Sequence, residues 1–313
     1  MRMKAFSILL LTCFLYASAF SQVAPTPLAT TLPSKISPTS IKKLQSYQDT
    51  LKEFAFYLNT DSLTEDRMVS DSQFTRTLVR ALQVPYSFHF PFDSVKGISK
   101  LYAPDSSFRI ITWNLQYNDY YNRQRGAIQL NTKNGSLKLF PLRDASEFTD
   151  HPEDSIRTAK NWVGATYYNI IKKEFQGKPF YTLFGIDANN AKSTIKWMEV
   201  LHFTQQGEPL FGGPFFSYQK DSVVLPTQYR IQLEYKKDAS ILMNYIPEMD
   251  LILIDHLISE NNDVEHKWTY VPDGDQEGFR WENGKWVHIN KVFTQKLKDG
   301  QAPREMPVKK NEN

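Results

Sequence analysis

The sequence predicts an α+β protein in which an antiparallel β meander carries most of the fold. Three observations support this class. Apolar residues alternate at period two through most of the chain after Ser99. Asn-Gly dipeptides at two points suit tight hairpin turns. Aromatic residues make up 14% of the sequence, which favours strands. Spacing alone leaves open whether the meander closes as a barrel, folds as a sandwich or stacks in propeller-like blades.

The chain opens with the pattern of a secretory signal peptide. Arg2 and Lys4 precede an apolar run that reaches Phe20, and small residues end the run before Gln22. We therefore predict a leader at residues 1–21 and export to the periplasm or the exterior of a bacterial cell. The run is shorter than a bilayer-spanning helix, and we expect no transmembrane segment in the mature chain.

Charge and cysteine content exclude several classes of function. The leader holds two of the 37 basic residues and no acidic residue, so the remainder carries 35 basic against 34 acidic side chains. Nucleic-acid binding requires a clustered basic field, so we expect no nucleic-acid partner. The one cysteine, Cys13, lies in the leader. Removal of the leader would exclude disulfides, thiolate metal sites and cysteine nucleophiles.

Composition divides the rest of the chain. Residues 22–39 are rich in Pro, Ser, Thr and Ala, and residues 298–313 form a polar tail, so we predict a disordered linker and a disordered tail. Between them we expect a helical hairpin at residues 40–97, packed on the sheet, and an antiparallel β domain at residues 98–297.

Two amphipathic helices are expected in the hairpin. Apolar residues recur every three or four positions over Ile41–Leu58, with Ser40 placed as the N-cap. A second segment of this kind runs over Ser70–Leu82 and precedes Pro85. The apolar stripes of both helices must be buried, and the sheet is the expected surface.

The β domain is expected to contain consecutive strands joined by short turns, which implies antiparallel pairing. Asn134-Gly135 and Asn283-Gly284 are the two expected hairpin turns. The predicted strands share β-branched and aromatic residues bounded by turn signals. They are Phe108–Asn114, Gly126–Leu130, Leu137–Leu142, Pro179–Ile186, Ile195–Phe203, Arg230–Tyr235, Ser240–Tyr245, Asp250–His256, Gly278–Trp281 and Trp286–Val292.

One inserted helix is expected at residues 154–175. Ile156, Val163 and Ile170 fall on one face at helical spacing, and Gly177 supplies the stop. A single helix among many strands cannot provide the crossovers of a parallel sheet. The meander is therefore expected to remain antiparallel around this helix.

Five segments of the β region resemble an uncharacterised family of exported proteins common in Bacteroidota. The resemblance covers about residues 155–293. It implies export and a shared fold, and it carries over no activity and no catalytic residue. The segments are YTLFGIDANNAKSTIKWMEVLHF, PLFGGPFF, RIQLEYKKDASILMNY, LILIDHLIS and YVPDGDQEGFRWENGKWVHI.

An acidic stretch is the candidate metal site. Asp273, Asp275 and Glu277 place carboxylates at alternate positions before Gly278, as the first half of an EF-hand loop does for Ca²⁺. The closing bidentate Glu is missing, because Gly284 stands at the twelfth position. A polar turn with solvated acids is favoured. A Ca²⁺ site completed by a distant residue is the alternative.

Tyr120 and Tyr121, with Arg123 nearby, are the candidate ligand-binding residues. They belong to the segment NDYYNRQRG, which is expected to be a loop that exposes its aromatic rings. Aromatic rings stack on sugars, although strand aromatics elsewhere are expected to pack in the core. A glycan or another envelope component is the expected partner.

Asp187, Asp255 and His256 invite a catalytic interpretation but have plainer explanations. Asp187 and Asn189 suit a tight turn after an apolar strand. Asp255 and His256 are adjacent in a strand, so their side chains should point to opposite faces and not meet.

No assembled catalytic motif is present, so the sequence assigns no catalytic residue. Ser193 and Lys196 match an SxxK pattern without the motifs that accompany it in hydrolases. The favoured function is therefore a non-catalytic exported protein that binds a ligand or partner through loops at one end of the sheet. The alternative is an extracytoplasmic hydrolase, cation-assisted or not, which needs Asp273 and the three residues above to converge in space.

Overall fold

The structure is a computed structural model that describes residues 36–222 and 224–293. The predicted leader at 1–21 and the tail at 298–313 lie outside the described residues, as does most of the linker at 22–39. In the part of the chain that the structure describes, no helix is both long and apolar enough to cross a membrane.

Two helices open the described chain, α1 at Pro38–Thr60 and α2 at Thr64–Leu82. The first begins within the predicted linker. Its N-cap is Ser37, whose hydroxyl accepts a hydrogen bond from the backbone N–H of Ser40 at 3.1 Å. Ser40 is therefore helical and not the cap. Pro38 suits the first helical position because its fixed φ is already helical.

Three sheets follow, together with five short 3₁₀ helices. The first sheet has the order β1-β2-β3-β4, with β1 at Ser99–Tyr102, β2 at Phe108–Asn118, β3 at Tyr121–Leu130 and β4 at Leu139–Arg143. The middle sheet has the order β5-β9-β8-β7-β6 with β11 also paired to β8, and its strands are β5 Arg157–Thr158, β6 Thr166–Phe175, β7 Lys178–Asp187, β8 Ser193–Phe203, β9 Pro209–Phe211 and β11 Arg230–Lys236. The third has the order β10-β15-β14-β13-β12, with β10 at Phe216–Ser217, β12 at Met243–Ile246, β13 at Leu251–Ser259, β14 at Tyr270–Glu282 and β15 at Lys285–Ile289. The 3₁₀ helices are η1 Ser87–His89, η2 Ser146–Phe148, η3 Pro152–Asp154, η4 Pro247–Met249 and η5 Lys267–Thr269.

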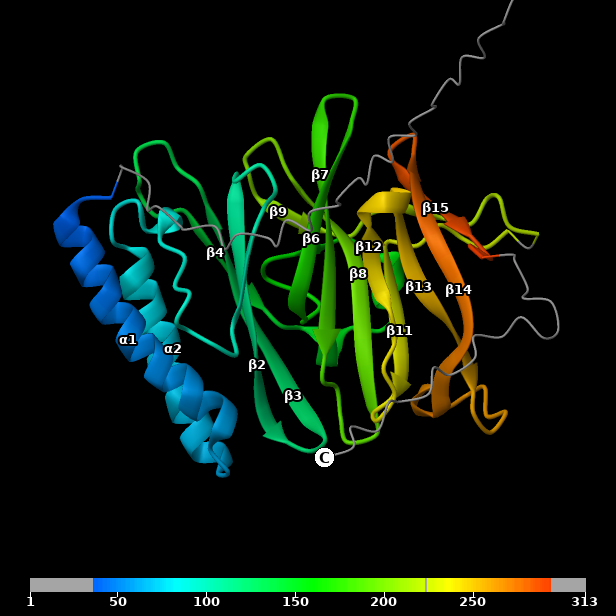
Figure 1. Cartoon of the computed structure of the whole chain (residues 1–313), viewed down its shortest axis with the longest axis horizontal. Coiled ribbons are helices and arrows are strands. Elements are labelled where there is room, and N and C mark those ends of the chain that lie inside the picture. The colour runs from blue at the N-terminus through cyan, green and yellow to red at the C-terminus, as the bar shows by residue number, and fades with distance from the viewer. Residues whose placement is uncertain (1–35, 223, 294–313) are drawn as a thin grey trace, which may run out of the picture. The chain divides into compact units, whose positions relative to one another are not determined.

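The helices cover one face of the first sheet (Figure 1). Phe74 of α2 meets the ring of Trp113 of β2 edge-on at 5.1 Å, and the indole Nε1 of Trp113 donates to Asp71 at 2.8 Å. The opposite face of β2 carries Phe108 and Ile110, which belong to a cluster shared with the middle sheet. The central strand β2 is therefore buried on both faces over most of its length.

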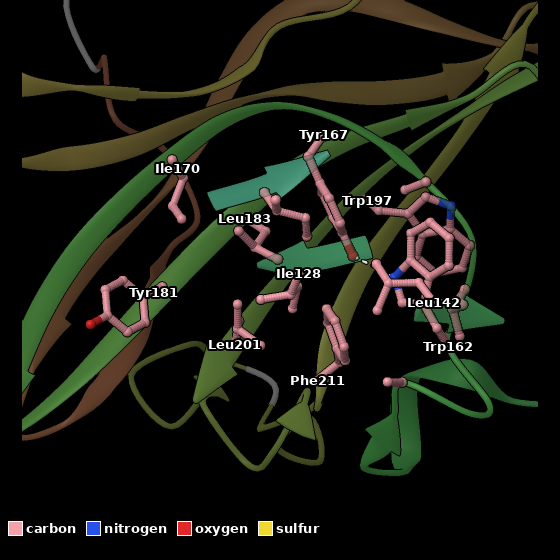
Figure 2. Packing of buried hydrophobic residues seen from close by; sticks show 14 of the residues in the cluster. Ile128, Leu142, Trp162, Tyr167, Ile170, Tyr181, Leu183, Trp197, Leu201 and Phe211 are labelled. Atoms are coloured by element: carbon pink, nitrogen blue, oxygen red, sulfur yellow. Dashed lines mark hydrogen bonds between the residues drawn. The ribbon is translucent and has the colours of Figure 1, made fainter. Parts of the chain in front are cut away.

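The middle sheet is also buried on both faces, which explains the near-continuous burial of β7 and β8. Tyr181 and Leu183 of β7 enter the cluster shared with the first sheet, which Figure 2 shows from close by. The neighbouring Phe180 and Phe184 contribute to a second cluster, shared with Ile252 and other residues of the third sheet. Strand residues alternate between faces, so one strand supplies two cores.

The predicted fold class is confirmed: the structure is β-rich, with two N-terminal helices and antiparallel sheets. The short β10–β15 pair is parallel. Asn283 and Gly284 form the expected turn, both with positive φ, between Glu282 of β14 and Lys285 of β15. Gly135 lies in a longer connection between β3 and β4, where a turn closes from its N–H to the carbonyl of Thr132 at 3.2 Å.

The predicted helix at residues 154–175 is wrong. The segment contains η3, β5 and β6, and β6 pairs antiparallel with β7. A β-bulge between Tyr167 and Asn169 shifts the alternation, so that buried Tyr167 and Ile170 stand three residues apart and imitate helical spacing. Gln176 and Gly177 both have positive φ and form the two-residue turn between β6 and β7. Gly177 therefore turns a hairpin and does not end a helix.

A buried polar network crosses the core of the middle sheet. Arg230 of β11 donates from Nε to Glu199 of β8 at 3.0 Å, and both side chains are almost fully buried. Tyr167 donates its hydroxyl to the other oxygen of Glu199 at 2.5 Å. The same hydroxyl accepts a hydrogen bond from the indole of Trp162 at 2.7 Å, and Figure 2 shows these two residues. Arg230 also donates to the carbonyl of Ser155 at 2.9 Å. Both carboxylate oxygens of Glu199 are therefore satisfied.

Candidate functional site

A cavity of about 320 Å³ opens where the first and middle sheets meet. Its walls come from the tip of the β2–β3 hairpin, the loop around η2 and η3, the end of β7, and parts of β8 and β11. The lining residues are Tyr120, Tyr121, Asn122, Ser146, Glu147, Thr149, Pro152, Val163, Asp187, Asn189, Ile195, Trp197 and Gln232.

The structure brings two of the three predicted ligand-binding residues into this cavity. Tyr120 and Tyr121 line it, and Arg123 does not. The expected loop is shorter than predicted, because β3 already begins at Tyr121 and Asn118 pairs with that residue across the hairpin. Tyr120 stands at the turn with 76% of its surface exposed. Its ring is therefore free to contact a ligand.

Asp187 is the most constrained polar residue of the cavity. It closes β7 with only 8% of its surface exposed. Its Oδ1 accepts two hydrogen bonds, from Gln124 Nε2 and from the backbone N–H of Asn189, both at 2.9 Å. Among the described residues, nothing donates to Oδ2. One oxygen of a largely buried carboxyl is thus left for a group inside the cavity.

Burial raises the pKa of Asp187 to about 6. The hydrogen bonds from Asn189 and Gln124 lower the pKa, and the nearby charge of Asp144 raises it. Desolvation outweighs the two hydrogen bonds and the nearby charge of Lys237, since no cation among the described residues forms an ion pair with this carboxyl. Near neutral pH the group therefore exists in both protonation states, as donor or acceptor.

A hydrogen-bond network centred on Gln124 holds the side chain of Asp187 in place. Gln124 Nε2 also donates to Asn114 Oδ1 at 3.1 Å, and Thr166 donates to Gln124 Oε1 at 3.0 Å. Asp144 accepts from the backbone N–H of Gln124 at 2.8 Å. Gly164 packs so closely here that a Cβ would lie 2.5 Å from Gln124 Cβ. The floor of the cavity is therefore rigid.

The other walls combine aromatic rings with polar groups. Tyr121 donates its hydroxyl to Glu147 Oε2 at 3.4 Å, and burial together with the charge of Glu147 raises the pKa of Tyr121. Trp197 is 5% exposed and its indole Nε1 is buried without a hydrogen-bond partner. No lining residue is Lys or Arg, whereas Asp187 and Glu147 are both acidic. The cavity therefore suits a neutral polar ligand better than an anion.

The turn interpretation of Asp187 and Asn189 is also correct. Asn189 has φ 50 and its N–H bonds back to Asp187, which is the geometry expected of an Asx turn. Asn189 Nδ2 then reaches Ser193 Oγ at 2.7 Å. The same residues thus shape the turn and line the cavity.

The three carboxylates of the predicted metal site each have a different partner. Asp273 bonds His256 Nδ1 at 2.9 Å, and Glu277 bonds His288 Nε2 at 3.1 Å. Asp275 pairs with Lys291 at 2.6 Å. Within residues 36–222 and 224–293, no group of three or more His, Cys, Asp or Glu side chains is placed to hold a metal ion as the structure stands. The EF-hand-like arrangement of these three carboxylates is therefore not formed.

The structure does not bring together the four residues that the hydrolase alternative requires. Asp255 and His256 line a second cavity, of about 230 Å³, beside β11, β13 and β14, whereas Asp187 lines the first. Asp255 accepts from the backbone N–H of Leu242 at 2.7 Å and does not touch His256. His256 meets Asp273 instead. A single centre built on all four residues is not assembled.

The SxxK pattern also lacks catalytic geometry. Ser193 donates to Glu234 at 2.5 Å, while the amine of Lys196 bonds the backbone carbonyl of Ile241. The two residues lie three apart on β8 and so face opposite sides of the sheet. Ser193 therefore anchors the turn before β8.

Sequence reasoning missed Glu147, Trp197 and Gln232 as cavity residues. Glu147 lies in a stretch without periodicity, and its approach to Tyr121 depends on the fold alone. Trp197 alternates with core residues along β8, so its pattern indicated only burial.

Comparison with protein-family models, curated proteins and solved structures finds no match to this chain.

Proposed function

We propose that the protein binds a small neutral glycan in the cavity around Asp187. The observation that carries this proposal is a single cavity that combines aromatic rings with a buried carboxyl and amides. Tyr120 and Tyr121 supply rings, Asp187 leaves one oxygen without a protein donor, and Asn189 and Gln232 add amide groups.

The chemistry of a sugar matches these groups. Its C–H faces stack on aromatic rings, and its hydroxyls both donate to carboxylates and accept from amides. A cavity of about 320 Å³ lies at the small end of ligand sites and fits about one or two sugar rings. The absence of Lys and Arg from the lining disfavours phosphate or sulfate groups.

The test is a binding screen of neutral mono- and disaccharides by calorimetry and by the fluorescence of Trp197, which lines the cavity. Tyr120→Ala should weaken binding by up to about tenfold through loss of stacking. Asp187→Asn should weaken it by about tenfold or more, since a charge-assisted hydrogen bond is lost.

Phe148→Ala is the matched control for Tyr120→Ala. Phe148 is 84% exposed and lies beside Glu147, but it is not a lining residue. Its replacement should leave the affinity unchanged. Equal effects of the two replacements, or no saturable binding of any neutral sugar, would refute the proposal.

Hydrolysis of the bound glycan is the second candidate function. Two carboxyl residues, Asp187 and Glu147, line the same cavity, and the pKa of Asp187, raised by burial to about 6, suits a general acid. Release of reducing sugar by the wild type, abolished in Asp187→Asn and Glu147→Gln, would support this function. Binding without turnover would leave the protein as a non-catalytic binder.

We also propose that the chain is exported after cleavage of residues 1–21, on the strength of the charged start and apolar run of the sequence. Expression in a Gram-negative host followed by N-terminal sequencing should find a mature chain that begins at Gln22. An uncut chain confined to the cytoplasm would contradict this part of the proposal.

A further inference from the structure

Two histidines on different strands direct their Nε2 atoms toward one carboxylate. His288 of β15 lies with Nε2 3.1 Å from Glu277 Oε2, and His256 of β13 lies with Nε2 3.9 Å from Glu277 Oε1. Glu277 stands on β14, between the two histidine strands. Two histidines, from the strands on either side of β14, therefore approach the same glutamate.

The strand register explains this approach. Ile254 pairs with Glu277, and His256 lies two residues further along β13 on the same face. Phe279 pairs with His288 and lies two residues beyond Glu277 on β14. Glu277 is thus a diagonal neighbour of both histidines on one face of the sheet, where long side chains meet.

A bulge in β14 brings a second carboxylate to His256. Leu257 of β13 pairs with Pro272 of β14, and Asp255 pairs with Gln276. The β14 segment between Pro272 and Gln276 therefore loops out opposite His256. The loop begins at Asp273, whose Oδ2 lies 2.9 Å from His256 Nδ1.

His288 has the same kind of support on its far side. Its Nδ1 lies 2.7 Å from Asp221 Oδ2, and only 5% of its side chain is exposed. Each histidine therefore has one carboxylate at Nδ1, Asp273 or Asp221, and shares Glu277 at Nε2. Histidines that bind metals almost always donate their second N–H to a carboxylate, carbonyl or water in this way.

The separations are close to those of a coordination shell. In a tetrahedral zinc site with metal–ligand distances of about 2.0–2.2 Å, neighbouring donor atoms lie about 3.3 Å apart. The distance of 3.1 Å between His288 and Glu277 is already in this range, and the 3.9 Å to His256 exceeds it modestly. As the structure stands, no group of three described His, Cys, Asp or Glu side chains is placed to hold a metal ion, so binding at this cluster requires a movement. A small rotation of His256, which is 41% exposed, closes the difference.

Solvent can reach the cluster. His256 and Glu277 both line the second cavity, of about 230 Å³, which leaves a route for a metal ion and room for a water ligand. Two imidazoles and one carboxylate are a donor set typical of Zn²⁺ and neighbouring first-row metals, whereas Ca²⁺ prefers oxygen ligands alone.

We propose that His256, His288 and Glu277 bind a divalent first-row transition metal, with Asp273 and Asp221 orienting the two imidazole rings. The metal takes the lone pair of each Nε2, and any proton held there passes to solvent. None of the three metal ligands lines the glycan cavity, although Gln232 lines both cavities, and the proposal does not depend on glycan binding.

The experiment is calorimetric titration of the purified, untagged protein with Zn²⁺, repeated with Ca²⁺, and supported by the visible absorption of the Co²⁺ form. One equivalent of Zn²⁺ should bind and Ca²⁺ should not. His256→Ala and Glu277→Gln should each weaken Zn²⁺ binding more than about a hundredfold. Asp273→Asn should weaken it by about tenfold to a hundredfold, the effect of losing an orienting carboxylate.

His266→Ala is the matched control. His266 also holds a carboxylate at Nδ1, Asp263 at 2.6 Å, and it is 45% exposed. Its replacement should leave Zn²⁺ affinity unchanged. Circular dichroism of each variant separates loss of binding from loss of folding. Absence of stoichiometric Zn²⁺ binding in the wild type, or equal loss in His266→Ala and His256→Ala, would overturn the proposal.

Discussion

Two buried carboxylates on neighbouring strands of the middle sheet have opposite surroundings. Glu199 of β8 is 2% exposed and bonds Arg230 and the hydroxyl of Tyr167. Asp187 of β7 is 8% exposed, bonds only uncharged donors and keeps Oδ2 free among the described residues. The first is fully compensated within the protein, and the second is not.

This difference separates a structural role from a functional one. Burying a carboxylate without a cation is costly, so such a group lowers the stability of the fold. Groups of this kind cluster at functional sites, where their altered chemistry is used. Glu199 fixes β8 to β11, and its partners leave no oxygen for a ligand. Asp187 faces a cavity with its free oxygen. We therefore assign the ligand site to Asp187 and not to the larger network.

The largest expected effect comes from breaking the compensated pair. Arg230→Met should lower the free energy of unfolding by about 3–5 kcal/mol, because it leaves Glu199 charged and buried without its cation. Urea denaturation at pH 7 measures the change. The double variant Arg230→Met/Glu199→Leu should be less destabilised than the single variant. A double variant as unstable as the single one would show that packing, and not charge, dominates this region.

Asp187→Asn should change stability in the opposite direction. The pKa of Asp187 in the folded state is about 6, above its ordinary 3.8, so the folded protein loses stability as pH rises from about 4 to above 6. Asn keeps the Oδ1 acceptor and cannot ionise. The variant should therefore gain up to about 3 kcal/mol relative to wild type at pH 8, and little at pH 4.

Asp250→Asn is the control for the sign of this effect. The hydrogen bond from Lys173 holds the pKa of Asp250 below its usual value. Asp250 therefore contributes stability above its unfolded pKa, and this is lost as pH falls through the lower folded pKa. Asp250→Asn should destabilise slightly at pH 8. Urea denaturation at several pH values measures both variants, and parallel pH profiles for the two would contradict the account.

The smallest expected effect is a difference in unfolding free energy between variants of two buried tryptophans. Trp162 donates to Tyr167 within the compensated network, whereas Trp197 Nε1 has no hydrogen-bond partner in the described part of the chain. Trp162→Phe should therefore cost about 1 kcal/mol more of unfolding free energy than Trp197→Phe, the worth of one hydrogen bond. Thermal denaturation of the two variants measures the difference. Equal losses would mean that the indole N–H of Trp162 contributes nothing to the network.

Much of the fold could be predicted because local signals agreed with it. The Asn283-Gly284 turn and the alternation of strands such as β7 and β8 are properties of short segments. The error at residues 154–175 arose where a bulge beside Tyr168 broke the alternation. Turn chemistry at Gln176-Gly177 was the signal that could have corrected it, since both residues adopt positive φ.

The candidate site was less predictable because it is built from distant segments. Tyr120 and Tyr121 were found from composition. Asp187 was attributed mainly to turn chemistry, with a catalytic role as the alternative, and no sequence pattern pointed to Glu147. Asp187 and Gln124 meet across 63 residues of sequence, and Asp221 and His288 across 67. Such pairings are set by sheet stacking and strand register, which residue spacing does not encode.

The most direct measurement is the ¹³C chemical shift of the Asp187 carboxyl carbon as a function of pH, assigned with the Asp187→Asn variant. The account predicts a titration midpoint near 6, from burial without a cation, and a shift of that midpoint when a bound sugar occupies Oδ2. A midpoint at or below the ordinary value of 3.8, unchanged by any sugar, would contradict the assignment of the site to Asp187.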